Sequence, residues 1–141
     1  MAHVYPEHPV IGVGAVVIRG TEVLLIRRGR PPSLGRWSLP GGKQKLGETV
    51  AEAAAREVME ETGLTIAVGA VAAVVDLIEP DEKGRIRYHY TVVDLLADWV
   101  AGEPVAGDDA EAATWAPLDG LDPFELTPRT LDVIAGAVAR R

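Results

Sequence analysis

The segment from Thr49 to Gly63 constrains the fold more than any other part of the chain, because it carries the signals for both ends of a helix. Thr49 and, three residues later, Glu52 form the pattern of a capping box, in which each side chain accepts a hydrogen bond from the other residue's backbone N–H. Gly63 supplies the left-handed residue at which helices commonly end. The sequence therefore predicts one helix over residues 49–62.

Three glutamates of this helix, Glu57, Glu60 and Glu61, stand at positions i, i+3 and i+4. At 3.6 residues per turn, these spacings place the three carboxylates within an arc of roughly 100°. Like charges so spaced repel by roughly a few tenths of a kcal/mol per pair, and a bound cation would relieve this repulsion. Oxygen ligands without Cys or His are typical of Mg²⁺ or Mn²⁺ sites rather than zinc sites. The alternative is that these three glutamates form an ordinary solvated helix surface. On the remaining side of the helix, Glu52 precedes Arg56 by four residues, an order that favours an ion pair between them.

The rest of the chain predicts several strands and one further helix. Residues 10–18 and 23–26 are apolar and β-rich on either side of a turn at Gly20, which predicts a hairpin. The other predicted elements are strands over 65–77, 86–96 and 114–116, a turn over 81–84, a loop over 101–110 and a helix over 128–140.

Glycines at two places need separate explanations. Gly12 and Gly14 are not followed by a third glycine and a helix, so they do not form a dinucleotide-binding loop. Close packing of the backbone on one face of a strand is the better explanation for them. The sequence Pro-Gly-Gly at 40–42 predicts a break in regular structure.

Length and composition exclude several classes of protein. The chain has 141 residues, 14 Lys and Arg, 21 Asp and Glu and no cysteine, with a net charge of −7. One domain over residues 1–141 is therefore expected. The charge argues against binding a nucleic acid polymer, and the lack of cysteine excludes disulfides and thiolate zinc sites. Without a signal-peptide pattern or an apolar run of roughly 20 residues, we expect a soluble, cytoplasmic protein that does not contact membranes.

The loop and the helix together carry a fixed pattern of residues from Gly42 to Leu64. It consists of Gly42, five residues, Glu48, seven residues, Arg56-Glu57, apolar Val58, any residue, Glu60-Glu61, any residue, Gly63 and apolar Leu64. The chain resembles the Nudix hydrolase family at every one of these positions. The resemblance implies an α/β fold, a Nudix-type α/β/α sandwich with a mixed central sheet. It also implies hydrolysis of a small-molecule substrate, a nucleoside diphosphate linked to another moiety.

The same resemblance assigns roles to residues of the pattern. Glu48 would assist within or beside a metal site, and Arg56 would orient the glutamates by charge-assisted hydrogen bonds. A diphosphate would be repelled by this acidic helix unless divalent cations bridged the two. The expected ligands of Mg²⁺, or of Mn²⁺ in its place, are the backbone carbonyl near Gly42 and the carboxylates of Glu57, Glu60 and Glu61.

The identity of the general base stays open between two alternatives. In some members of the family a glutamate of the pattern takes the proton, and in others an acid of the downstream loop binds metal or takes the proton. The loop acids here are Asp108, Asp109 and Glu111, and Asp109 is taken as the representative candidate. Turn formation is the alternative role for the two aspartates, because Gly-Asp-Asp is an ordinary turn sequence.

Arginines that precede the glycine pair are candidates for binding phosphate. Arg27, Arg28 and Arg36 offer bidentate donors. The backbone of Gly41 and Gly42 is a further candidate for substrate binding. Since successive side chains of a strand point to opposite faces, one of the adjacent pair Arg27 and Arg28 is expected to contact substrate.

Two tyrosines, Tyr88 and Tyr90, fall on one face of a predicted strand, and His89 falls on the other. One tyrosine is a candidate for stacking on a base. Packing in the core, or pairing across strands, is the interpretation that we favour.

The substrate is predicted from a single proline. Family members that cleave ADP-ribose often carry a proline about sixteen positions beyond the pattern, and Pro80 stands sixteen positions after Leu64. The first candidate is therefore ADP-ribose, with AMP and ribose 5-phosphate as products. One alternative is a nucleoside triphosphate pyrophosphohydrolase for damaged nucleotides such as 8-oxo-dGTP, and another is a noncatalytic Nudix-fold nucleotide sensor. Dimers are common in the family, so a homodimer is a candidate assembly.

Overall fold

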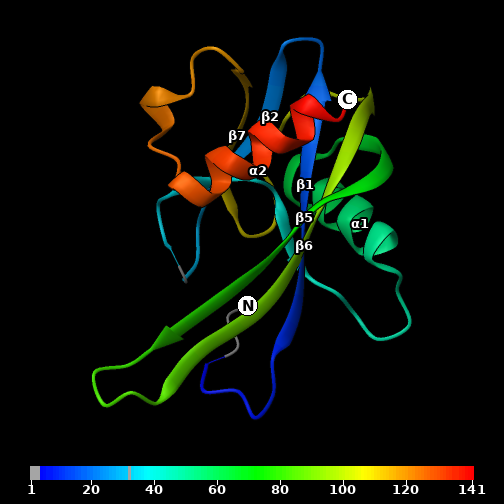
Figure 1. The fold of residues 1–141 in the computed structure, drawn as a ribbon. Helices are drawn as coiled ribbons and strands as arrows, with labels where there is room; N and C mark the ends of the chain where they lie inside the picture. Colours follow the sequence, from blue (N-terminus) through cyan, green and yellow to red (C-terminus); the bar gives the residue numbers. More distant parts are fainter. Residues whose placement is uncertain (1–3, 32) are drawn as a thin grey trace.

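A mixed sheet lies between two helical layers in the computed structural model, which describes residues 4–31 and 33–141 (Figure 1). This arrangement confirms the expected α/β/α sandwich. In chain order, the elements of the described residues are β1 (Val10–Arg19), β2 (Glu22–Arg28), β3 (Trp37–Ser38), β4 (Gly41–Lys43), α1 (Val50–Thr62), β5 (Thr65–Pro80), β6 (Ile86–Ala101), β7 (Ala110–Pro117), the 3-10 helix η1 (Asp122–Phe124) and α2 (Pro128–Ala139).

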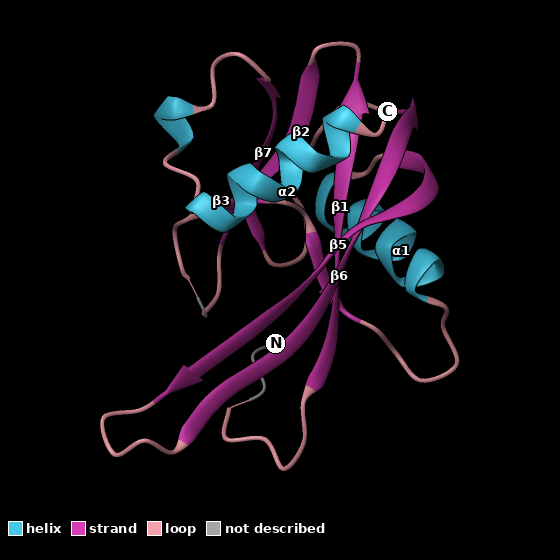
Figure 2. Cartoon of the chain, viewed as in Figure 1, coloured by secondary structure: helices cyan, strands magenta, loops and turns pink. Residues whose placement is uncertain are grey.

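The sheet is mixed because its central strands run parallel while their neighbours run antiparallel. Its order is β3-β2-β1-β6-β5, with β4 paired to β1 and β7 paired to β2. The predicted hairpin is present, with Ile18 of β1 opposite Val23 of β2. Closer to its start, β1 pairs with β4 over Gly12 to Gly14 and with β6 on its other side. The long hairpin of β5 and β6 extends away from the body of the molecule (Figure 2).

Helix α1 begins and ends where the sequence predicts. The side chain of Thr49 accepts a hydrogen bond from the backbone N–H of Glu52 at 3.0 Å, and the reciprocal bond of the capping box is 2.9 Å. Gly63 has a φ of 74°, the left-handed conformation that glycine adopts without a steric penalty. Val58 lies on the buried side of the helix. Local sequence signals are thus sufficient to fix this element.

The two helices cover opposite faces of the sheet because side chains alternate along β1. Val17 points toward α1 and belongs to a buried cluster with Val58, whereas Val16 and Ile18 pack with Val133 of α2. These two apolar layers hold β1 rigidly at the centre of the molecule. The C-terminal half of β1, which follows Gly12 and Gly14, is therefore packed on both faces.

The predicted break at 40–42 is confirmed at Pro40, which lies between β3 and β4, but it is wrong for Gly41 and Gly42, which lie in β4. A Cβ atom at Gly41 would collide with the backbone of Val13, so glycine is what allows this close strand pairing. The short elements β3 and η1 are not predicted from the sequence, and several strands are longer than expected: β5 runs to Pro80, β6 to Ala101, and β7 begins at Ala110. The end of a strand depends on how far the neighbouring strand pairs with it, and the apolar pattern of one strand does not show this.

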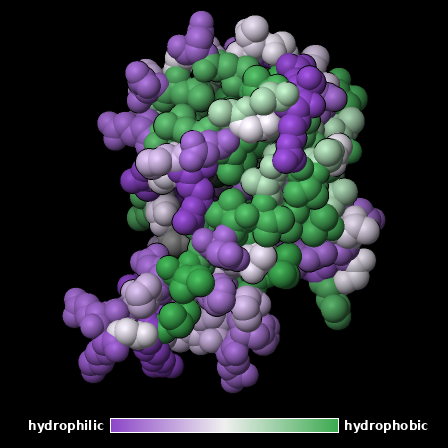
Figure 3. All heavy atoms as spheres, in the orientation of Figure 1, coloured by the Kyte–Doolittle hydropathy of each residue, from purple (hydrophilic) through white to green (hydrophobic). Residues whose placement is uncertain are grey.

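The surface gives no sign of a membrane span in the part of the chain that the structure describes, where no helix combines the length and the apolar character needed. Hydrophilic side chains surround the free end of the β5–β6 hairpin (Figure 3).

Apolar side chains are nevertheless exposed along β5, including Val74 and Ile78, which are 62% and 54% exposed.

Candidate active site

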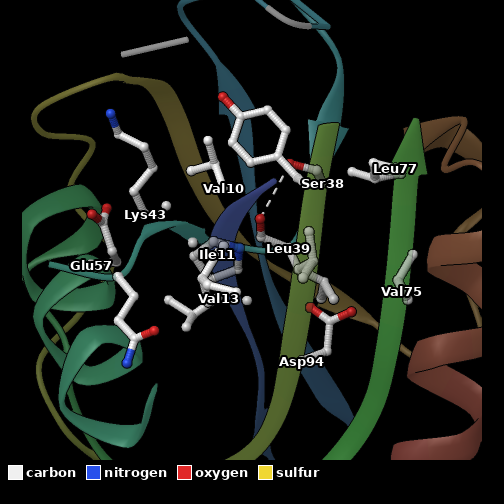
Figure 4. A pocket seen from close by; sticks show the side chains of 18 of the residues that line it. Val10, Ile11, Val13, Ser38, Leu39, Lys43, Glu57, Val75, Leu77 and Asp94 are labelled. Carbon is white, nitrogen blue, oxygen red and sulfur yellow. Dashed lines mark hydrogen bonds between the residues drawn. The ribbon is translucent and has the colours of Figure 1, made fainter. Parts of the chain in front are cut away.

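A cleft of about 1720 Å³ crosses the molecule where β1 begins. The first half of β1, β4 and facing parts of α1, α2, β5 and β6 line it. In Figure 4, Lys43 and Glu57 lie on one side of β1, and Val75, Leu77 and Asp94 lie on the other. The cleft is thus large enough for an extended ligand. Charged side chains lie on one side of β1, and mainly apolar side chains with Asp94 lie on the other.

Three carboxylates meet at the α1 end of the cleft. One oxygen each of Glu57, Glu60 and Asp108 lies within 4.8 Å of the others. Burial raises the pKa of Glu57, and the charges of Glu60 and Asp108 raise it further. The carboxylates therefore repel one another as they stand. Such hard oxygen donors suit Mg²⁺ or Mn²⁺, so the residues fit the divalent cation that the family resemblance implies.

Asp108 reaches this cluster because its loop is docked on the end of α1. The backbone N–H of Gly107 donates to the carbonyl of Glu61 at 2.9 Å, and that of Val105 donates to the carbonyl of Thr62 at 3.0 Å. Asp108 itself has a φ of 49°, a left-handed conformation in which aspartate is tolerated. The last turn of the helix thus positions an acid that is 48 residues away from Glu60 in the sequence.

Glu61 stands apart from the cluster, although the helix spacing predicts that it shares the face of Glu57 and Glu60. It is 3% exposed, on the core side of α1, and accepts a hydrogen bond from the backbone N–H of Gly41 at 2.8 Å. Burial raises the pKa of this carboxyl to about 8. The structure therefore places Glu61 as a link between α1 and β4, and its role as a metal ligand stays a prediction.

Arg56 is the centre of a network that holds the other carboxylates. Its guanidinium donates to Glu48 at 2.6 and 2.9 Å, to Glu57 at 2.8 Å and to the carbonyl of Lys43 at 3.0 Å. A longer contact of 3.3 Å reaches Glu60. The hydrogen bonds from Arg56 lower the pKa of Glu48 to about 2. These are the contacts that an orienting role requires.

Gly42 brings the backbone of β4 against the carboxylate of Glu57. A Cβ atom at position 42 would collide with that carboxylate, so any larger residue would displace it. Both Gly41 and Gly42 line the cleft. The glycine pair therefore serves the close approach of a strand to a functional side chain.

The predicted phosphate-binding arginines separate in the structure. Arg28 and Arg36 line the cleft, and Arg36 also donates to the carbonyl of Glu125 at 3.1 Å. Arg27 lies outside the cleft and forms an ion pair with Glu111 at 2.9 Å. Strand alternation thus distributes the adjacent arginines as expected, with one of them in the cleft.

The predicted loop acids also separate. Asp108 joins the carboxylate cluster, whereas Asp109 forms an ion pair with Arg30 at 2.8 Å while lining the cleft. Glu111 is held by Arg27 outside the cleft. Asp108 is therefore the loop acid closest to the glutamates of α1, in place of the representative candidate Asp109.

The two tyrosines of β6 have different surroundings. Tyr88 is 6% exposed, as core packing predicts, and the guanidinium of Arg87 lies 5.4 Å from its ring centroid. Tyr90 is half-buried and lines the cleft. Of the two, Tyr90 is the ring that a bound ligand can reach.

Sequence reasoning missed Asp94, a buried acid in the cleft. It is 7% exposed, lies on β6 opposite Gly14 of β1 and has apolar neighbours along its own strand. Burial raises its pKa to about 6. The signal that would have found it is a lone aspartate inside the apolar run Val-Val-Asp-Leu-Leu, where burial of a charge demands an explanation.

This burial predicts a pH-dependent stability difference between the wild type and Asp94→Asn. An acid whose pKa rises from roughly 3.9 in the unfolded chain to about 6 in the fold destabilises the protein progressively as the pH rises through that interval. Relative to the wild type, the variant should gain on the order of 2–3 kcal/mol in free energy of unfolding between pH 4 and pH 8. Urea denaturation of both proteins at a series of pH values measures the difference, and parallel curves would contradict the burial of this charge.

A cleft lined by clustered carboxylates and by arginines is typical of enzymes that act on phosphate groups. Comparison with known proteins narrows this class. A model of the NUDIX domain matches residues 8–136. The chain therefore belongs to the Nudix family, and it is a hydrolase of diphosphate bonds in nucleotide substrates.

Its relatives carry more than one substrate name. The chain is 39% identical over 145 residues to a putative 8-oxo-dGTP diphosphatase 2 of Mycobacterium tuberculosis, across 93% of this chain and 96% of that protein. It is 37% identical over 114 residues, 81% of its length, to an ADP-ribose pyrophosphatase of Methanocaldococcus jannaschii, of which it spans 65%. The crystal structure of a MutT Nudix hydrolase from Burkholderia pseudomallei is 36% identical with a TM-score of 0.79, across 92% of this chain and 98% of that one.

Proposed function

We propose that this chain holds Mg²⁺, or Mn²⁺ in its place, on Glu57, Glu60 and Asp108 and hydrolyses a phosphoanhydride bond of a nucleotide in the adjoining cleft. The observation that carries this proposal is the cluster of three carboxylates at one end of a cleft that Arg28 and Arg36 also line. A diphosphate brought to this end would be repelled without a cation. When bound, the cation neutralises phosphate charge and makes water more acidic.

The chain's own residues hold this site in place. Arg56 orients Glu48 and Glu57 by hydrogen bonds of 2.6 to 2.9 Å. Glu61 fixes the backbone of Gly41 in β4, so that the next residue, Gly42, lies directly against Glu57. Rigid placement of charged groups that face the developing charge of the transition state is a main source of rate enhancement in enzymes.

The proton of the attacking water needs an acceptor near the cluster. Asp108 is the loop acid that reaches it, and we assign to Asp108 the binding and proton-accepting roles that the sequence left open among the loop acids. Asp109 and Glu111 are each neutralised by an arginine. Glu60, the more exposed glutamate of the cluster, is the alternative acceptor.

Two substrates remain in competition. ADP-ribose is supported by the name of the archaeal relative. A nucleoside triphosphate such as 8-oxo-dGTP is supported by the name of the mycobacterial relative, which matches nearly the full length of both chains. Pro80, which predicts ADP-ribose, lies at the exposed end of β5 and not among the described residues that line the cleft.

Product analysis with Mg²⁺ separates the candidates. ADP-ribose, NADH, a set of nucleotide sugars and damaged deoxynucleoside triphosphates would each be incubated with the wild type and with Glu60→Gln. AMP formed fastest from ADP-ribose would support the sugar diphosphatase, and pyrophosphate formed from triphosphates would support the other enzyme. A folded, metal-loaded protein that is silent on every substrate would contradict both and favour a nucleotide sensor.

Arg28 and Arg27 provide a matched pair for testing phosphate binding. Arg28→Ala should raise KM by about tenfold or more, because a charge-assisted bond to phosphate in the cleft is lost. Arg27→Ala removes a partly exposed ion pair outside the cleft and should change KM by less than about twofold. Steady-state kinetics on the best substrate measures both, and equal effects would overturn the assignment of Arg28.

The assembly and location of the protein stay predictions. A second copy would cover the apolar side chains exposed on edge strand β5, among them Val74 and Ile78. Light scattering across a range of concentrations would detect the proposed homodimer. The cytoplasmic location rests on the sequence alone.

A further inference from the structure

We propose that Asp94 selects the nucleobase of the substrate by accepting hydrogen bonds from two adjacent N–H donors, the pair that guanine presents at N1 and N2. This inference rests on the proposed function, because it takes the cleft to hold a nucleotide with its phosphates at the carboxylate cluster. It names a base-selecting residue and, with it, the class of substrate.

Burial of the Asp94 carboxylate has a cost in free energy. A carboxyl group that is 7% exposed needs hydrogen-bond donors or an ion-pair partner to offset the loss of water. Among the residues that the structure describes, none donates a hydrogen bond to Asp94 or pairs with it. Burial alone raises its pKa to about 6, so the carboxylate is mainly ionised near neutral pH and lacks a donor.

Strand β1 leaves room for this carboxylate. Asp94 lies opposite Gly14, and a Cβ atom at Gly14 would collide with the Oδ1 atom of Asp94. The nearest atom from any other residue is the backbone carbonyl oxygen of Pro40, at 3.7 Å from that Cβ position, and an acceptor cannot satisfy a carboxylate. The position is therefore shaped to hold an acid and leaves its donors to come from elsewhere.

Asp94 lines the cleft. Asp94 lies on the same side of β1 as Val75 and Leu77, which also line the cleft, and on the opposite side from Glu57 (Figure 4). Tyr90 lines the same cleft on the same strand. Apolar side chains such as Val75 and Leu77 beside a buried carboxylate suit the ring and the polar edge of a base. The carboxylate cluster at the other end then receives the phosphates.

The acceptors of Asp94 match the donors of guanine. An ionised carboxylate offers two acceptor oxygens and no donor. Guanine presents two donors side by side, N1–H and the 2-amino group, and oxidation at C8 leaves both in place. Adenine presents the 6-amino donor next to the acceptor N1, so one oxygen of Asp94 would face a lone pair. The chemistry therefore favours guanine nucleotides over ADP-ribose and other adenine nucleotides.

Exchange of the acid for its amide gives a sharp test. Asparagine offers one acceptor and one donor, the arrangement that matches adenine. With Mg²⁺, the wild type should favour dGTP over dATP in kcat/KM by about a hundredfold, and Asp94→Asn should lower this ratio by about ten- to hundredfold through the KM for dGTP. Deoxyinosine triphosphate, which lacks the 2-amino group, should lie between the two substrates in the wild type.

Asp98→Asn is the matched control, since Asp98 lies four residues further along β6, where it is exposed. It should leave the dGTP to dATP ratio unchanged. A purely structural role of Asp94 would lower kcat/KM for both nucleotides equally. Such an equal loss, or a wild-type ratio near one, would overturn the proposal.

Binding without turnover separates this inference from the proposed function. Calorimetric titration of the protein in the presence of Mg²⁺ with dGMP and dAMP, which contain no phosphoanhydride bond to hydrolyse, should show tighter binding of dGMP, and Asp94→Asn should reverse or abolish the difference. If no nucleotide is hydrolysed, this result would still support base selection while the hydrolase assignment fails. If dGMP and dAMP bind equally, or neither binds, base selection by Asp94 is overturned whether or not hydrolysis is observed.

Discussion

Glu60→Gln is expected to lower kcat by about two to three orders of magnitude while leaving the protein folded. The substitution keeps the size of the side chain and removes the charge that Glu60 contributes to the cluster with Glu57 and Asp108. A neutral amide repels the two neighbouring carboxylates less, so the free energy of unfolding should stay the same or rise slightly. Steady-state kinetics at saturating substrate, together with urea denaturation, measures both effects.

Two controls make this result specific to the cation site. Glu82→Gln removes the same charge at an exposed turn between β5 and β6 and should leave kcat unchanged. The Mg²⁺ concentration that gives half-maximal rate should rise in Glu60→Gln and stay constant in Glu82→Gln. A folded Glu60→Gln protein with full activity at the wild-type Mg²⁺ concentration would mean that the cluster does not hold the catalytic cation.

Parts of the site could be predicted because their signals are local. The capping box of Thr49, the left-handed Gly63 and the fixed spacing from Gly42 onward all lie within one loop and one helix. Strand alternation, another local rule, separates Arg28 in the cleft from Arg27 outside it. These rules predict the ends of α1 and the side on which Arg28 lies because residues close in the sequence determine both.

Other parts depend on contacts between distant segments. Helix geometry places Glu61 beside Glu57, but the burial of one side of α1 against β4 draws it away to Gly41. The favourable i, i+4 order predicts a pair between Arg56 and Glu52, yet Glu52 is occupied in the capping box. A helical wheel describes angles around one axis and does not show which neighbouring strand or loop meets each angle.

The same limit explains why Asp108 and Asp94 could not be chosen from the sequence. Asp108 joins the cluster through two backbone hydrogen bonds of its loop to the end of α1, and nothing within Gly-Asp-Asp specifies that docking. The carboxylate of Asp94 fits in the cleft because Gly14, 80 residues earlier in the chain, leaves space for it. Both depend on the tertiary arrangement that packing of the whole sheet creates.

Arg56→Ala should impair both stability and turnover, because one guanidinium holds three carboxylates and a carbonyl. The side chains of Arg56, Glu48 and Glu57 are 20%, 19% and 13% exposed, between the limits of a buried and a surface ion pair. Removing the arginine leaves these carboxylates unpaired, so we expect a loss of about 2–3 kcal/mol in free energy of unfolding. We also expect kcat to fall by about tenfold or more, since Glu57 loses its orienting contact.

Arg56→Lys tests whether charge or geometry produces these effects. Lysine keeps the positive charge but lacks the planar set of donors that reaches Glu48 twice and Glu57 and the Lys43 carbonyl at once. If geometry matters, Arg56→Lys should recover part of the stability and little of the turnover. For comparison, Arg30→Ala removes an arginine that is 58% exposed and should cost less than about 1 kcal/mol. Full recovery of kcat by lysine would show that charge alone suffices, and that the fork of Arg56 does not position the glutamates for catalysis.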